Sequence, residues 1–563
     1  MFSRSRSSET HFQRRLSVAL VGLVLALLWM MLLGGRALLD PDEGRYAEIP
    51  REMLTSGDWI IPHLDDLAYL EKPPLQYWAT AIAYRALGVN EWTARLWTGL
   101  TSLLTIFAVY RFAAQQWDLR AGRWAAGILA SSTLFLLMGH IITLDASLTF
   151  FLTVALTSFC RAQQHREDAN ALRRDMLLCW AGMALAVLTK GAIGVVIPGA
   201  VLALYTLWQR DWRVLQHLQV RRGLALFCVI VLPWFLLAAH QNSDFLRFFF
   251  VHEHLERFLT PSAERSQPWW FFGVIFAAGA LPWLPQALRA LRWGARPSVP
   301  AGHFDVRRLL WVWCIFVVIF FSASHSKLAP YILPMFPALA LLIGSDPRAH
   351  SERSIGLMLA ATATFAVMLV LAPLAAPWLA KRPDGIGALH ALGTNMALIA
   401  AALVAGGGVA MIVLRRHGAP AAAATLGVVW FCALAFTLKG LGPGMPWLSG
   451  KALAREVPAA NNPRLPLYTI EEYRHSLQFY WQRPLVPVHY RGELALGLGE
   501  NPKMGVASLQ DFERLWRAAR DGLAIMPLHT WQQLCMAHLP MYVVAIDSMD
   551  VVVRRDPGAA TIK

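Results

Sequence analysis

A succession of apolar stretches, each close to the length that crosses a lipid bilayer, constrains this chain more than any other feature. The first stretch, residues 17–35, follows a basic start and is too long for a signal peptide, and no small-residue cleavage site comes after it. We therefore expect it to remain as the first membrane span. Further spans are predicted at residues 92–114, 123–140, 146–162, 176–189, 191–208, 223–240, 268–288, 309–323, 329–345, 355–378, 391–414 and 419–437. The chain is thus predicted to be a polytopic α-helical membrane protein with about 13 transmembrane helices.

The charge of the connectors predicts the orientation of these spans. The chain is 56% hydrophobic, only 15% charged and carries a formal net charge of +15. Arginines recur in every second connector, for example Arg120 and Arg123, Arg173 and Arg174, on the side that the N-terminus occupies. The positive-inside rule places that side in the cytoplasm. The basic charge therefore reflects topology, and nucleic-acid binding, which needs Lys and Arg on an exposed soluble face, is not expected.

The composition changes near residue 440. Residues 1–440 form the predicted membrane domain, and residues 441–563 alternate short β-like runs with helical stretches, which predicts a soluble α/β domain. An odd number of spans places this domain on the periplasmic face. The expected strands are 465–470, 485–490, 522–528 and 541–546, and the expected helix is 508–520.

The first external loop, residues 38–90, is rich in carboxylates. Acidic groups are unfavourable beside lipid headgroups, so we expect them to turn inward toward a polar cavity. Asp42 is the strongest candidate for a functional carboxylate, and a helix-capping role is the alternative for it. Arg45, Glu48 and Glu52 follow at helical spacing, and an amphipathic helix is predicted at 74–87.

A rigid tetrad, Glu71-Lys72-Pro73-Pro74, follows Tyr69 in the same loop. The two prolines fix the backbone and make Lys72 extended. A single ammonium binds a phosphate well only when it is held in place, so Lys72 is a candidate phosphate ligand. The alternative is a lysine that anchors the chain at the lipid headgroups.

Four more segments bring polar residues to the same face. Asp145 and Lys190 flank predicted spans, and the loop 250–265 contains His254 and Arg257 one helical turn apart. The segment 322–334 contains His325 and the i, i+4 pair Lys327 and Tyr331, where a helix start offers N–H donors to an anion. An interfacial Lys and Tyr belt is the alternative for that pair. Glu71 and His252 are the expected ligands if a divalent ion such as Zn or Mg binds, although no HxH or HExxH motif completes the set.

In this order and on this side of the membrane, the motifs resemble those of the ArnT family, aminoarabinose transferases of the GT-C class related to protein O-mannosyltransferases. The matching motifs are the acidic loop with Asp42, Glu71-Lys72-Pro73, Asp145, Thr189-Lys190-Gly191, His254 to Arg257-Phe258, and Ser326-Lys327-Leu328 with Tyr331, Leu333 and Pro334. The resemblance is specific over residues 17–345 and only architectural beyond them.

The resemblance implies a GT-C fold and a lipid-linked-sugar-dependent glycosyltransferase of the bacterial inner membrane. The implied reaction moves 4-amino-4-deoxy-L-arabinose from undecaprenyl phosphate to a lipid A phosphate, which gives resistance to polymyxin and cationic peptides. The predicted catalytic residues are Asp42, Asp145 and Glu48. The predicted substrate and lipid-phosphate ligands are Arg45, Tyr46, Tyr69, Lys72, Lys190, His254, Arg257, His325, Lys327 and Tyr331.

The sequence is also compatible with two other functions. A GT-C enzyme with another polyprenyl-phosphate-linked sugar and a protein or glycan hydroxyl acceptor would share every general feature. A polyprenyl phosphate flippase would need polar groups along a path through the bilayer, and the spans contain few charges at mid-helix. The C-terminal segment could also be a separate binding module. The oligomeric state is open, and a monomer is compatible with the sequence.

Overall fold

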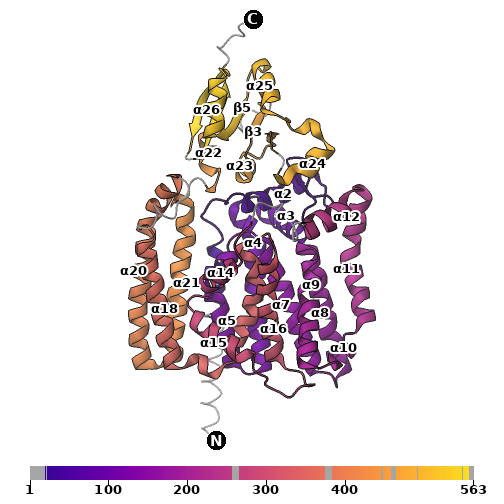
Figure 1. Ribbon diagram of the computed structural model, residues 1–563, viewed down its shortest axis with the longest axis vertical. Coiled ribbons are helices and arrows are strands. Elements are labelled where there is room, and N and C mark those ends of the chain that lie inside the picture. Colours follow the sequence, from indigo (N-terminus) through magenta and orange to yellow (C-terminus); the bar gives the residue numbers. More distant parts are fainter. Residues whose placement is uncertain are drawn as a thin grey trace.

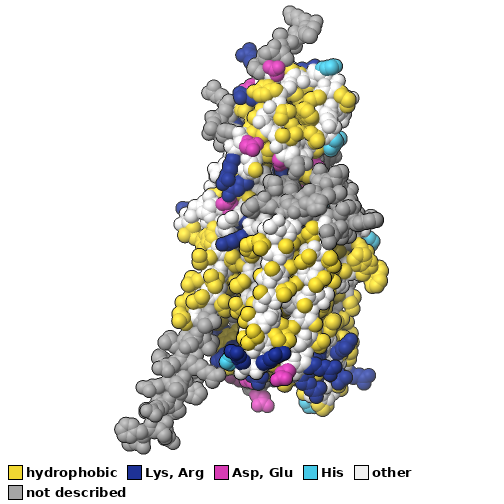
Figure 2. Space-filling model, turned by 90° about the vertical axis from the view of Figure 1, so that its left-hand side faces the viewer, with side chains coloured by type: hydrophobic (Ala, Val, Ile, Leu, Met, Phe, Trp, Pro, Cys, Tyr) yellow, Lys and Arg dark blue, Asp and Glu magenta, His cyan; other side chains and the backbone are white. Residues whose placement is uncertain are grey.

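The protein is a bundle of long helices that carries a smaller α/β domain at one end (Figure 1). The computed structural model describes residues 20, 22–256, 266–373, 383–444, 448–457, 465–490, 492–547 and 549–556. We call the end of the bundle that bears the first loop and the C-terminal domain the loop face. On the face drawn in Figure 2, hydrophobic side chains cover the middle of the bundle, and Lys and Arg gather at the end opposite to the loop face.

The bundle has the helices of a multi-pass membrane protein. Seven described helices are long and apolar enough to cross a membrane on their own: α4 (Glu91–Gln116), α7 (Leu144–Gln164), α11 (Val220–Gln241), α16 (Val306–Ala323), α18 (Glu352–Leu371), Gly393–His417 of α20 (Pro383–His417) and Ala419–Gly440 of α21 (Ala419–Gly444). The remaining predicted spans fall on α5 (Leu119–Ser131) with α6 (Thr133–Met138), α8 (Ala169–Lys190), α9 (Ile193–Gln209), the bent pair α14 and α15, α17 (Phe336–Ser345) and Gly22–Met31. The count of 13 spans stays a prediction.

Two predicted spans are not continuous helices. Residues 268–288 form α14 (Phe271–Gly279) and α15 (Leu284–Gly294), which are bent by 114°. Pro282 lies between them, where a proline has no N–H to donate and clashes with the preceding turn. The span 123–140 is interrupted at Ser132, and the next residue, Thr133, donates its N–H to the carbonyl of Leu281 at 3.1 Å. The two breaks therefore contact each other.

Helix α7 lies at the centre of the bundle and is the most buried of the seven long spans. It packs closely on α8, because Gly182 has no side chain where a Cβ would lie 2.9 Å from the carbonyl oxygen of Phe151. Asp145 is in the first turn of α7 and Lys190 is the last residue of α8. Their antiparallel packing thus brings both residues to the loop face.

The first loop folds into α2 (Asp42–Ser56), a short hairpin of β1 (His63–Leu64) and β2 (Leu67–Ala68), and α3 (Leu75–Leu87). Helix α3 confirms the predicted helix at 74–87. The hairpin was not predicted. Its turn residues, Asp65 and Asp66, have φ of +63° and +57°, the left-handed conformation that Asp tolerates better than most residues.

The C-terminal domain contains a five-stranded sheet of order β4-β3-β5-β7-β6. Strands β3 (Leu467–Ile470), β4 (Val486–Val488), β5 (Leu523–Pro527) and β6 (Met541–Ile546) confirm the four predicted runs, and α25 (Leu509–Ala518) confirms the predicted helix. β3 is parallel to β4 and β5. The fifth strand, β7 (Asp550–Arg555), is antiparallel to β5 and β6 and was missed, because its apolar run is only three residues long.

The C-terminal domain is fixed to the first loop through α23 (His475–Trp481), which packs on α2. A Cβ on Gly44 would lie 2.2 Å from the backbone nitrogen of Ser476, so only glycine allows this approach. The backbone N–H and the hydroxyl of Ser476 each donate to the Asp40 carboxylate at 2.6 Å. The domain is therefore part of the wall around the first loop, which argues against an independent module.

Candidate active site

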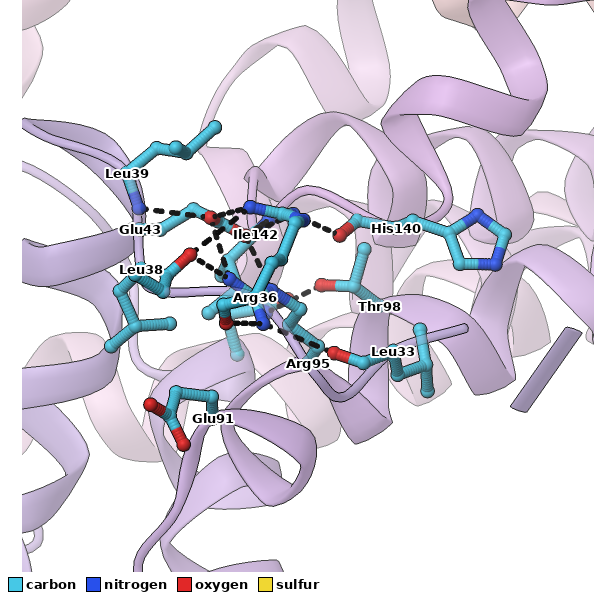
Figure 3. A network of polar contacts seen from close by, with 12 residues as sticks. Leu33, Arg36, Leu38, Leu39, Glu43, Glu91, Arg95, Thr98, His140 and Ile142 are labelled. Atoms are coloured by element: carbon cyan, nitrogen blue, oxygen red, sulfur yellow. Dashed lines mark hydrogen bonds and ion pairs between the residues drawn. The ribbon is translucent and has the colours of Figure 1, made fainter. Parts of the chain in front are cut away.

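A buried network around Glu43 holds the first loop against the bundle (Figure 3). Arg36 donates to both oxygens of Glu43 at 2.6 and 3.0 Å, and Arg95 of α4 donates at 2.8 and 2.9 Å. The backbone N–H groups of Leu39 and Ile142 also donate to this carboxylate, each at 3.0 Å. Burial alone would raise the pKa of Glu43, but the two guanidiniums hold it well below its usual range. The network fixes the neighbour of Asp42 beside the connector that leads to Asp145.

Asp42 pairs with Arg45 on the same face of α2, so it does not cap the helix. Arg45 is almost fully buried and lies 5.0 Å from the centre of the Tyr46 ring and 5.9 Å from that of Tyr69. A second carboxylate, Glu493 in η6 (Gly492–Leu494), reaches Arg45 from the C-terminal domain at 2.8 Å. Arg45 therefore lies between two carboxylates and against two phenol rings.

Tyr69, Glu71 and Lys72 form a second group at the start of α3. The Tyr69 hydroxyl donates to Glu71 at 3.1 Å, and the Lys72 ammonium lies 3.9 Å from the same carboxylate oxygen. Lys72 also donates to the Glu71 carbonyl at 3.0 Å, and 17% of its side chain is exposed. Burial raises the pKa of Tyr69 well above its usual value, so this phenol stays neutral and donates.

Asp145, Lys190 and Tyr331 form a third group. The Lys190 ammonium donates to Asp145 at 2.6 Å and lies 4.5 Å from the centre of the Tyr331 ring. Tyr331 belongs to η2 (Ala329–Met335), a 3-10 helix that packs on α7. A carboxylate, an ammonium and a phenol from three separate segments thus meet at one point.

Two hydrogen bonds join the three groups. Ser147, in the first turns of α7, donates to Gln76 of α3 at 2.9 Å, which places the Lys72 segment beside Asp145. The bond from Ile142 to Glu43 places Asp42 beside the same turn of α7. The predicted residues Asp42, Arg45, Tyr46, Tyr69, Glu71, Lys72, Asp145, Lys190 and Tyr331 therefore lie in one neighbourhood on the loop face.

Other predicted residues lie elsewhere. Glu48 is fully buried and accepts from Arg51 at 2.5 and 2.8 Å. It follows Asp42 by six residues, which is about 120° around the helix from Asp42. The carboxylate of Glu48 is thus engaged by Arg51.

The predicted helical pair Lys327 and Tyr331 is wrong, because η2 begins only at Ala329 and Leu328 is extended. Lys327 is buried and His325 is exposed. The side chain of His254 and the whole of Arg257 lie outside the described residues, so their pairing stays a prediction.

The two predicted metal ligands each contact other side chains. His252 is exposed on the π-helix η1 (Phe248–Glu256), and its ring stacks on Phe248 at 5.3 Å. Glu71 is engaged by Tyr69 and Lys72. Within the described part of the chain, no group of three or more His, Cys, Asp or Glu side chains is placed to hold a metal ion. The divalent ion stays a prediction.

Sequence reasoning missed Glu493 and the arginines that hold Glu43. Arg95 carried a signal, because it is a single arginine near the start of an apolar span and such residues usually pair inside the protein. Glu493 carried none, since its role depends on how the C-terminal domain packs on α2.

Two family models and several curated proteins match parts of this chain. Residues 15–249 match the family model of dolichyl-phosphate-mannose-protein mannosyltransferases, and residues 453–555 match that of the aminoarabinose transferase C-terminal domain. The undecaprenyl phosphate-alpha-4-amino-4-deoxy-L-arabinose arabinosyl transferase of Pseudomonas aeruginosa is 36% identical over 339 residues, 59% of each chain. The protein of the same name from Erwinia tasmaniensis is 34% identical over 370 residues, 63% of this chain and 65% of that one.

Solved structures extend the likeness to the whole chain. The crystal structure of ArnT from Cupriavidus metallidurans bound to undecaprenyl phosphate has a TM-score of 0.87 and 33% identity, and covers 96% of this chain and 98% of that one. An oligosaccharyltransferase from Archaeoglobus fulgidus has a TM-score of 0.50 at 14% identity over 92% of this chain and 69% of that one, which shows the fold alone.

The fold and the polar site define a membrane protein of the GT-C class, with a C-terminal α/β domain that closes over the loop face. The Pseudomonas and Erwinia relatives are matched over 59% and 65% of their own length, and the Cupriavidus structure over nearly all of it. The chain belongs to the ArnT family.

Proposed function

We propose that the chain transfers 4-amino-4-deoxy-L-arabinose from undecaprenyl phosphate to a phosphate of lipid A. The observation that carries this proposal is the group of Asp145, Lys190 and Tyr331 beside Lys72, a mixture of carboxylates, ammoniums and phenol at one end of a hydrophobic bundle. Such a site suits a lipid that presents a charged headgroup at the membrane surface. The choice of 4-amino-4-deoxy-L-arabinose as the sugar rests on the names of the Pseudomonas and Erwinia relatives.

The cations of the site suit the leaving group. When the bond between the anomeric carbon and the undecaprenyl phosphate oxygen breaks, its electron pair stays on the phosphate, which leaves as a dianion. Ammoniums held in place, such as Lys72 and Lys190, stabilise the negative charge that grows in the transition state. Lys190 is fixed by Asp145 at 2.6 Å, so it needs no reorganisation during the reaction.

The acceptor determines the role of the carboxylates. A lipid A phosphate is ionised near neutral pH, so its oxygen attacks the anomeric carbon without a strong base. Asp42 and Asp145 are then free to hold the sugar, including its ammonium group, and to orient it for attack. One direct displacement inverts the anomeric centre.

The location and partners follow from the same proposal. The loop face lies on the periplasmic side of the bacterial inner membrane, since Lys and Arg gather at the opposite end of the bundle. The partners of the chain are the undecaprenyl-linked donor, the lipid A acceptor and the surrounding membrane lipids. Its product would give resistance to polymyxin and cationic peptides.

A second acceptor class has one specific observation in its favour, because residues 15–249 match the mannosyltransferase family model. In that case a hydroxyl attacks, and Asp42 or Asp145 would have to take its proton. Purified protein in proteoliposomes, with the lipid-linked aminopentose as donor, tests both acceptors. We expect sugar transfer to lipid A and none to peptide or glycan hydroxyls. Transfer only to a hydroxyl would overturn the acceptor, and donor movement across the bilayer without transfer would indicate a flippase.

A divalent ion held by Glu71 and His252 is kept as a proposal, with no catalytic step assigned to it. Treatment with a chelator, followed by elemental analysis and the transfer assay, tests it. Full activity of metal-free protein would remove the proposal.

A further inference from the structure

Two buried carboxylates lie where the first loop meets the C-terminal domain, at the end of α2 away from Asp42. Glu52 is 4% exposed and Asp65, in the turn of the β1–β2 hairpin, is 2% exposed. Both accept a hydrogen bond from the same side-chain amide nitrogen, Nε2 of Gln478 on α23, at 2.7 and 3.2 Å. Their accepting oxygens are therefore within about 6 Å of each other.

Neutral donors surround this pair. Glu52 also accepts the backbone N–H groups of Asp65 and Asp66 at 2.8 and 3.1 Å, and Asp65 accepts that of Leu485 at 2.6 Å. The second oxygen of Asp65, Oδ2, is buried without a hydrogen-bond partner. Gln478 is itself oriented by the Tyr473 hydroxyl, which donates to its amide oxygen at 2.8 Å.

The charges on the neighbouring elements do not neutralise the pair. On α2, the charge of Arg51 reaches Glu52, but Arg51 is bound by Glu48, and Glu48 adds another carboxylate beside the pair. The hairpin adds Asp66. The C-terminal domain adds Tyr473, whose phenol lies against the Asp65 carboxylate and stays neutral, because burial raises its pKa well above the usual value. Among the ion pairs between described residues, none includes Glu52 or Asp65. Arg474, at the other end of α23, is bound by Asp40, Asp547 and Asp550.

Two carboxylates so close in a buried contact cannot both be ionised at low cost. Burial raises the pKa of Glu52 to about 8, and the Glu48 carboxylate adds to that rise. Burial also raises the pKa of Asp65 well above its usual value. If the hairpin and α23 separated, both groups would return to water and to their ordinary values. Docking of the two elements thus takes up a proton.

We propose that the contact of Glu52 and Asp65 with Gln478 is a proton-linked latch, which holds the C-terminal domain tightly on the first loop when the pair carries a proton and loosens when the pair loses it. The sign follows from the raised pKa of the docked state: local docking is strongest in acid and weakens as the pH rises toward 8. For one proton the local docking constant falls by at most about tenfold per pH unit between the two pKa values. Asp40 with Ser476 and Glu91 with Lys451 keep the domains joined when the latch loosens.

Hydrogen–deuterium exchange of the full-length protein in nanodiscs tests the latch without any transfer assay. We expect the protection factors of the hairpin and of α23, corrected for intrinsic exchange, to fall by about tenfold or more between about pH 5.5 and about pH 7.5. Glu52→Gln imitates the protonated carboxyl and keeps its size, so it should keep the acid-level protection at both values. Asp65→Asn should do the same.

Asp58→Asn is the matched control, because Asp58 is a partly exposed carboxylate of the same loop. It should keep the wild-type fall in protection. Protection of the wild type that does not change with pH would overturn the latch. The latch would also be overturned if Glu52→Gln and Asp65→Asn kept the wild-type change of protection with pH. Titration of Asp40 or Asp550, which bind Arg474, would then cause that change. Loss of the change in Asp58→Asn would also overturn the latch.

Discussion

Replacing Glu493 with Gln tests whether the C-terminal domain forms part of the active site. Glu493 is the carboxylate that this domain extends to Arg45, 2.8 Å away. Although burial raises the pKa of Glu493, the bond from His475 and the charge of Arg45 hold it well below its usual range, so the group is ionised. Glu493→Gln removes this charge and keeps the size of the side chain.

The magnitude follows from burial. The Arg45 side chain is 3% exposed and that of Glu493 is 17% exposed. Breaking a fully buried ion pair costs about 3–5 kcal/mol. Here the Gln oxygen still accepts a hydrogen bond and Asp42 still pairs with Arg45, so we expect about 1–3 kcal/mol. If this energy is lost from the transition state, kcat/KM falls by roughly 5- to 150-fold.

The assay is sugar transfer by purified protein, with the melting temperature measured in parallel. We expect kcat to fall while the C-terminal domain stays docked, because Asp40 and Glu52 still bind α23. Asp521→Asn is the control, since Asp521 pairs with Arg554 on the same domain, away from α2. It should leave kcat within about twofold of wild type. Wild-type kinetics for Glu493→Gln would refute a positioning role for the domain.

Three further substitutions test the groups around this pair. Asp145→Asn should lower kcat by about 10²- to 10³-fold with an intact fold, because Lys190 loses the carboxylate that fixes it; near-normal turnover would contradict the assignment. Lys72→Ala should weaken binding of undecaprenyl phosphate by about tenfold in a direct binding assay. Lys503→Ala, on the surface of the C-terminal domain, should leave the affinity unchanged, and equal affinities of the two variants would contradict the phosphate role of Lys72. Glu43→Gln should destabilise the protein by about 3 kcal/mol, against under 1 kcal/mol for Glu91→Gln, when unfolding is followed by denaturant titration.

The sequence predicts the membrane architecture well where a rule depends only on local composition. Apolar length finds the helices, and the basic connectors match the gathering of Lys and Arg at one end of the bundle. The prediction of continuous spans fails at Pro282 and at Ser132, because an apolar run has the same composition whether its helix is continuous or broken. Strand β7 is missed because its apolar run is only three residues long, and its place between β5 and β6 depends on tertiary structure.

The candidate site is predicted in part. Asp145, Lys190 and Lys72 are charged residues beside apolar spans. Such residues usually face a polar cavity inside the protein, so the sequence alone identifies them as site candidates. Contacts between distant surfaces leave no such signal. Glu493 and Gln478 look like ordinary surface residues of a soluble domain until α23 is seen on α2. Glu48 is predicted to be catalytic, but in the structure its carboxylate is bound by Arg51.

Mass spectrometry of lipid A tests the central claim most directly. Cells that make the undecaprenyl-linked aminopentose but have no transferase of their own would carry either this chain or its Asp42→Asn variant, at equal expression. The account predicts lipid A heavier by one aminopentose with the wild-type chain and a strongly reduced amount with the variant. Unmodified lipid A with the wild-type chain, or equal modification by both, would contradict it.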